Sequence, residues 1–64
     1  PQDNPLAAKD LGHFKKLAAE AATLDDLAAL EAANKEAIDK MDKKTYAAVK
    51  EVMDARDSEL REAA

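Results

Sequence analysis

Apolar positions recur at steps of three and four residues along three stretches of the chain. This spacing places side chains on one face of an α-helix. We therefore expect helices over residues 5–22, 24–41 and 43–62, each burying one face. The large side chains expected in the core are Phe14, Leu17, Leu27, Leu30, Ile38, Tyr46, Val49, Met53 and Leu60.

Polar residues at the predicted helix starts are of the types that cap free backbone N–H groups. Asn4 precedes Pro5, and proline at the first helical position costs no hydrogen bond. Gly12 weakens the first stretch by about 1 kcal/mol relative to alanine. Its opening turns could therefore bend or form a separate short helix ahead of Asp10, although we expect one continuous helix.

The second and third helices have their own start signals. Thr23 is followed three residues later by Asp26, the spacing of a capping box in which Asp26 would bond the Thr23 backbone. Asp42 is the expected cap of the third helix. Both connections are short, and short connections make neighbouring helices antiparallel.

The predicted fold is thus all-α: a small three-helix bundle, up-down-up, with the second and third helices forming an antiparallel hairpin. At 64 residues the chain has room for a single domain, 1–64, whose core is barely sufficient for stable folding. It opens on Pro1 and not on methionine. We therefore expect it to be a fragment of a larger protein.

Alanine dominates the apolar composition, with sixteen residues, whereas Leu, Ile, Val and Phe together number eleven of 64. Such a low content of large apolar residues makes disorder an alternative, but the regular helical spacing and the high helix propensity of alanine argue against it. Cysteine is absent, which is compatible with the reducing cytoplasm where we place the protein. No apolar run approaches 18 residues, so no membrane association is expected.

Charge is unevenly distributed along the chain, whose net charge is −4. An acidic chain is not expected to bind nucleic acid directly. In an up-down-up bundle one end would collect the lysines Lys9, Lys40, Lys43 and Lys44. The other end would collect Glu20, Asp25, Asp26, Asp57, Glu59 and Glu62, relieved by Arg61. Part of this pattern simply suits the helix dipoles, but crowded lysines repel unless an anion relieves them. We therefore expect the four lysines to bind a partner protein through an acidic peptide.

Catalytic chemistry is not expected. His13 is the single histidine, and it has no carboxylate nearby at metal-ligand spacing, so we interpret it as a surface residue. Asp25 and Asp26 point to different sides of one helix and cannot form a paired-carboxylate site. The sequence also has no glycine-rich phosphate loop, nucleophile elbow or zinc-ligand spacing. We predict no enzymatic activity, no cofactor and no metal site.

Two polar residues interrupt the apolar stripes. Asn34 is either a buried polar group that fixes helix register, as one asparagine can in a coiled coil, or a residue at the edge of the core. Arg56 is expected to lay its stem along Leu27 while its guanidinium reaches Glu31 or solvent. We favour a structural role for Arg56 over a binding role.

The run Ala22-Thr23-Leu24-Asp25-Asp26-Leu27 is followed by Leu30, Asn34, Ile38, Tyr46, Val49, Arg56 and Leu60. Over roughly residues 21–60 this pattern resembles the C-terminal helical accessory segment of phage single-strand-annealing recombination proteins. In that family a separate N-terminal domain performs annealing, and the tail contacts partners such as a host single-stranded-DNA-binding protein or a companion exonuclease. The resemblance implies a non-catalytic protein-interaction module that docks such a partner.

Two other functions remain open. The chain could be an independent three-helix binding or inhibitor module that acts through its acidic end, or a purely structural domain that holds a larger assembly together. The accessory-tail hypothesis places the contact at the lysines, whereas the inhibitor hypothesis places it at the carboxylates. The oligomeric state is not predicted by any of these patterns.

Overall fold

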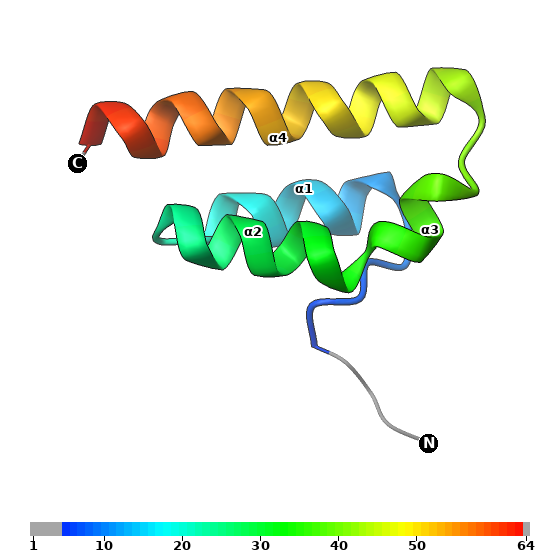
Figure 1. The fold of residues 1–64 in the computed structure, drawn as a ribbon, viewed down its shortest axis with the longest axis horizontal. Coiled ribbons are helices and arrows are strands. Elements are labelled where there is room, and N and C mark those ends of the chain that lie inside the picture. The colour runs from blue at the N-terminus through cyan, green and yellow to red at the C-terminus, as the bar shows by residue number, and fades with distance from the viewer. Residues whose placement is uncertain (1–4, 64) are drawn as a thin grey trace.

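The computed structural model describes residues 5–63, whose regular secondary structure is entirely α-helical. The helices are α1 (Leu11–Glu20), α2 (Leu24–Ala33), the short α3 (Lys35–Asp39) and α4 (Lys43–Ala63). α2 runs back beside α1, and the long α4 then lies lengthwise along both helices (Figure 1). The expected all-α domain with three substantial helices is therefore confirmed. α4 packs more extensively on α1 than on α2, so it is not simply one arm of a hairpin with α2.

The first helix begins at Leu11 and not at Pro5, so the expectation of one continuous helix over 5–22 is wrong. Asp10 has an extended backbone, and its Oδ1 accepts the His13 backbone N–H at 2.8 Å. This cap satisfies a donor that a helix start would otherwise leave free. A start at Leu11 also places Gly12 in the first turn, where its low helix propensity costs less than it would in a helix interior.

The second expected helix is broken at Asn34, which has φ −110° and ψ 7° and separates α2 from α3. The Asn34 Nδ2 donates to the Leu30 carbonyl at 2.8 Å. Asparagine side chains often compete with helical backbone bonding in this way. The expected span 24–41 is therefore two helices, α2 and α3, and not one.

Asn34 is buried, with 4% of its surface exposed, and it holds the segment before α1 in place. Its Oδ1 accepts the Ala8 N–H at 2.8 Å, and its Nδ2 donates to the Leu6 carbonyl at 2.7 Å. The buried alternative is therefore confirmed. What the side chain fixes is the position of a non-helical segment on α2, and not the register between two helices. The cap expected at Asn4 lies outside the described residues.

The core lies where the three long helices meet. Its buried apolar residues are Phe14, Ala18, Ala21, Leu27, Leu30, Val49 and Leu60. Five of the expected core residues are confirmed in this set, and Leu17, Ile38 and Met53 pack half-buried at its edge. Tyr46 was expected inside but is 46% exposed. It lies where α4 passes α3, beside a groove that leaves much of its ring uncovered.

Arg56 acts as a cap for the end of α1. Its Nη2 donates to the carbonyl of Ala21 at 2.6 Å, and Nη1 lies 3.8 Å from the Glu59 carboxylate. The last carbonyls of a helix lack intrahelical partners, so a partly buried guanidinium is well suited to them. The expectation that the Arg56 guanidinium reaches Glu31 is wrong, because this side chain points to the end of α1.

The expected cap at Thr23 is confirmed. Its Oγ1 accepts the Asp26 N–H at 3.1 Å. The return bond differs from the expectation, since Asp26 Oδ2 accepts the N–H of Ala22 at 3.3 Å and not that of Thr23. The turn between α1 and α2 is therefore closed by side-chain bonds on both of its sides.

Replacing Thr23 with alanine should lower the free energy of unfolding by about 0.5 to 2 kcal/mol, the usual cost of losing such a cap. Urea denaturation would measure the loss, and backbone amide exchange at Asp26 should accelerate. Thr23→Ser is the matched control, because it keeps the hydroxyl and should stay close to the parent. Unchanged exchange at Asp26 in the alanine variant would show that the hydroxyl does not cap α2.

Candidate functional site

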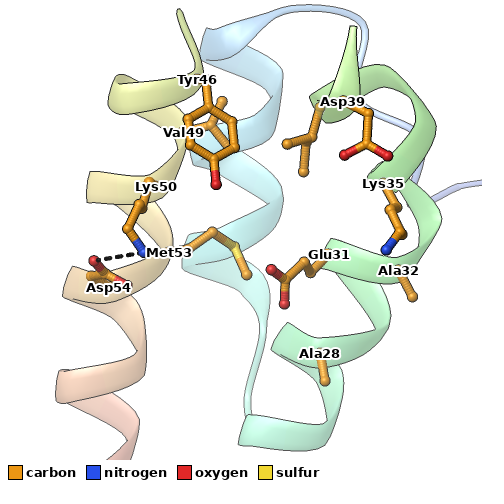
Figure 2. A pocket seen from close by; sticks show the side chains of 11 residues that line it. Ala28, Glu31, Ala32, Lys35, Asp39, Tyr46, Val49, Lys50, Met53 and Asp54 are labelled. Carbon is orange, nitrogen blue, oxygen red and sulfur yellow. Dashed lines mark ion pairs between the residues drawn. The ribbon is translucent and has the colours of Figure 1, made fainter. Parts of the chain in front are cut away.

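An open groove runs between α2 and α3 on one side and α4 on the other (Figure 2). We call it the α2–α4 groove. Its larger part has a volume of about 520 Å³. The residues that line this part are Ala28, Glu31, Ala32, Lys35, Ile38, Asp39, Tyr46, Val49, Lys50, Met53 and Asp54.

The groove continues toward the start of α2. A second hollow, of about 370 Å³, shares Ala28, Glu31, Met53 and Asp54 with the first. It adds Leu24, Asp25, Leu27, Asp57 and Arg61. The two hollows therefore form one surface feature that follows α2 from its first turn to α3.

Two short side chains on the α2 face that borders the groove help to keep it open. Ala28 and Ala32 are exposed on this face, whereas Leu27 and Leu30 are buried in the core. Alanine has no atoms beyond Cβ, so it cannot fill the space that separates α2 from α4.

The α4 side supplies an apolar floor. Val49 is buried, Met53 is half-buried and Tyr46 is largely uncovered. In Figure 2 the Tyr46 ring lies over Val49, and the Met53 side chain reaches from α4 toward α2. Of the described residues, Tyr46 is the large hydrophobic side chain that is most exposed.

Charges on the α4 wall are paired within that helix. Lys50 Nζ lies 4.0 Å from Asp54 Oδ2, and Arg61 Nε donates to Asp57 Oδ1. These are pairs of residues four apart along one helix, where each is worth a few tenths of a kcal/mol. They leave the α4 wall close to neutral.

Charges on the opposite wall are not paired. Within residues 5–63, the side chains of Asp25, Glu31, Lys35 and Asp39 make no ion pair or hydrogen bond. The Glu31 carboxylate points from α2 toward α4, into the hollow (Figure 2). Three carboxylates against one lysine give the α2–α3 wall an excess negative charge.

The sequence does contain a signal for this wall, which we did not interpret as a site. Small or charged side chains recur at helical spacing at positions 25, 28, 31, 32, 35 and 39. This face of α2 and α3 lies beside the apolar stripe. Without the position of α4, it cannot be distinguished from an ordinary solvated helix face.

The segments that carry the four predicted lysines come together at one end of the bundle (Figure 1). They are the stretch before α1, the end of α3 and the start of α4. Lys40 pairs with Glu36 at 3.5 Å. The others, Lys9, Lys43 and Lys44, are exposed and make no ion pair within residues 5–63.

Carboxylates on the same segments offset these lysines. They are Asp10, Glu36, Asp39 and Asp42. Hydrogen bonds from the side chain and the backbone N–H of Thr45 hold the pKa of Asp42 below its usual value, so this cap of α4 stays charged at neutral pH. Two of these carboxylates, Asp10 and Asp42, cap helices, and with Glu36 and Asp39 they match the four lysines in number.

The acidic residues expected at the other end have differing partners. Asp26 accepts the Ala22 N–H in the turn before α2, Asp57 pairs with Arg61, and Glu59 lies near Arg56. Glu20, Asp25 and Glu62 are exposed and make no ion pair within the described part of the chain. Asp25 is the member of this set that also faces the α2–α4 groove without a partner.

The structure gives no group of three or more His, Cys, Asp or Glu side chains that could hold a metal ion among residues 5–63. His13 is half-buried, and its Nδ1 accepts the Lys9 backbone N–H at 3.0 Å. This bond ties the imidazole to the start of α1. The absence of enzymatic activity stays a prediction.

None of the helices in the described part of the chain combines the length and the apolar character needed to cross a membrane. The likeness to phage annealing proteins, and the role that it implies, stay predictions. No protein-family model, curated protein or solved structure matches this chain.

Proposed function

We propose that this chain is a non-catalytic protein-interaction module that binds a helix of another protein in the α2–α4 groove. The observation that carries the proposal is the exposure of Tyr46, which is 46% exposed in the groove beside the buried Val49 and the half-buried Met53. Exposed tyrosine at a concave surface is typical of binding interfaces, where aromatic residues act as anchors.

The shape of the groove favours a helical occupant. Two neighbouring helices, α2 and α4, form its walls, and a third helix laid between them would pack on both. The exposed Ala28 and Ala32 allow such a helix to approach α2 closely. A small-molecule site is less well supported, because those sites are mostly apolar, whereas five of the eleven residues that line the larger hollow are charged.

A groove-filling substitution tests this proposal. Helical peptides would be selected from a displayed library for binding to the parent protein, and their contacts mapped by amide chemical shifts. Ala32→Trp places a bulky ring in the groove from an exposed position and should weaken binding at least about tenfold, or about 1.4 kcal/mol. Its circular-dichroism melt should stay close to that of the parent.

The matched control is Ala55→Trp, since Ala55 is exposed on α4 and does not line the groove. Peptides that shift the signals of Tyr46 and Met53, and that lose affinity for the Ala32 variant alone, support the proposal. Peptides that bind both variants as tightly as the parent, or whose contacts map elsewhere, would refute it.

The end of the bundle that carries Lys9, Lys40, Lys43 and Lys44, which we call the lysine end, is a second candidate surface for binding a partner protein. It is favoured by the exposure of Lys9, Lys43 and Lys44, which have no ion-pair partner in the described part of the chain. An accessory tail of a recombination protein would use these lysines to dock an acidic segment, such as that of a single-stranded-DNA-binding protein. Shift changes at Lys43 and Lys44, in place of the groove, would favour this candidate.

A further inference from the structure

We infer that the α2–α4 groove is selective for a basic amphipathic helix, whose apolar stripe covers Tyr46 and Met53 and whose lysines or arginines face the α2–α3 wall. The inference rests on the proposed function and adds the chemical class of the partner. It follows from the difference between the two walls of the groove, one with paired charges and the other without.

The α2–α3 wall presents Asp25, Glu31 and Asp39 to the groove with no partner of their own among residues 5–63. Lys35, between Glu31 and Asp39, is the one cation on this wall. An arriving cationic side chain would therefore complete ion pairs that the fold leaves open. Complementary potentials of this kind speed encounter and reject partners of the wrong charge.

Glu31 contributes to charge selectivity through its desolvation as well as through attraction. Its carboxylate points into the hollow (Figure 2), so a helix lying in the groove would cover it. A covered carboxylate without a cation or hydrogen bond opposes binding, because its lost hydration is not replaced. A neutral helix would incur this cost, and an acidic helix would add repulsion to it.

Spacing along the wall predicts where the cations should lie on the partner. At about 1.5 Å of rise per residue, Asp25 and Glu31 are separated by roughly 9 Å along α2. Asp39 lies beyond the break at Asn34, on α3. Two turns of a partner helix cover a similar length. A partner with lysine or arginine about every seven residues along one edge would therefore meet Asp25 and Glu31, and its next basic residue would extend toward α3, which carries Asp39.

Other occupants fit the charges less well. A second copy of this chain carries a net charge of −4, so its helices would approach an acidic wall with a charge of the same sign. A nucleic-acid strand would bring phosphates toward the same carboxylates. A basic helix is the occupant for which both the apolar floor and the acidic wall are favourable.

The test uses three synthetic helical peptides of about 20 residues that share one Leu/Ala stripe. They differ at three positions, spaced seven residues apart along one edge of the helix. These three positions are all Lys in the first peptide, all Gln in the second and all Glu in the third. Affinity for the parent would be measured by fluorescence anisotropy at low and high salt, and the site by amide shifts. We expect the Lys peptide to bind about tenfold more tightly than the Gln peptide at low salt, and the Glu peptide to bind most weakly. The preference for the Lys peptide should shrink at high salt, because salt screens the charges.

A triple variant, Asp25→Asn with Glu31→Gln and Asp39→Asn, should reduce the preference for Lys over Gln to about twofold or less while the Gln peptide still binds. The matched control is Glu20→Gln with Glu51→Gln and Glu62→Gln. These exposed carboxylates lie outside the groove, and the control changes the net charge equally. The control should keep the preference.

The outcomes separate this inference from the proposed function. Charge selection by the α2–α3 wall is refuted if the Lys and Gln peptides bind equally tightly in the groove. It is also refuted if the control variant loses the preference for the Lys peptide as fully as the groove variant does. In both cases the proposal that the groove binds a helix stands. If no peptide shifts the groove signals at any salt concentration, or if the Glu peptide alone binds and does so at the lysine end, both proposals fail.

Discussion

Replacing Leu30 with alanine should destabilise the domain by about 2 to 5 kcal/mol, the range for removing a buried leucine side chain. Leu30 is 1% exposed and belongs to the same core cluster as Phe14 and Val49, so one side chain helps to join α1, α2 and α4. Domains of this size have few kcal/mol to lose. We therefore expect the variant to be largely unfolded near room temperature, as measured by its circular-dichroism melt.

Leu24→Ala is a useful control for this experiment. Leu24 is half-buried at the edge of the core, so the same chemical change should remove less contact and leave a smaller cavity. The variant should melt between the parent and the Leu30 variant. A Leu30→Ala melt that matched the parent would contradict the core described above.

Replacing Asn34 with alanine should cost about 2 to 4 kcal/mol. Three hydrogen bonds are lost, to Leu6, Ala8 and Leu30, and each contributes about 0.5 to 1.5 kcal/mol net. The segment before α1 should then detach from α2. Urea denaturation would measure the stability, and amide exchange at Ala8 should accelerate more than exchange in the middle of α4.

Asn34→Asp distinguishes hydrogen bonding from simple volume. Its carboxylate would face the carbonyls of Leu6 and Leu30 in place of the Nδ2 donor, and burial beside carbonyl oxygens raises the pKa of such a group. A raised folded-state pKa means that stability is lost as pH rises. This variant should therefore be less stable near pH 7 than near pH 5, relative to Asn34→Ala. The absence of this difference would show that the amide is not held as described.

Much of the fold could be predicted from the sequence because its causes are local. Helical spacing gave the three main helices, and the caps at Thr23 and Asp42 act on backbone groups within three residues of themselves. Leu27, Leu30 and Leu60 were correctly placed in the core. Each of these results depends on residues close together in the chain, so a periodic pattern is sufficient to reveal it.

The candidate site was only partly accessible to this reasoning. The lysines stay a predicted binding site, and the sequence pattern alone did not show how the carboxylates on the same segments offset them. Tyr46 has the spacing of a core residue and is nevertheless 46% exposed. Whether an aromatic residue on an apolar stripe is covered depends on the side chain opposite, and here the opposite wall carries Ala28 and Ala32.

By itself the sequence determined the helical character of the chain, the faces that its helices bury and the caps that start α2 and α4. The tertiary structure decided where α1 begins, the break at Asn34, the target of Arg56 and the open groove. Asn34 bonds residues 26 and 28 positions away, and Arg56 bonds one 35 positions away. Such bonds leave no periodic trace, because their partners are backbone groups that every residue has, and only packing brings them within reach.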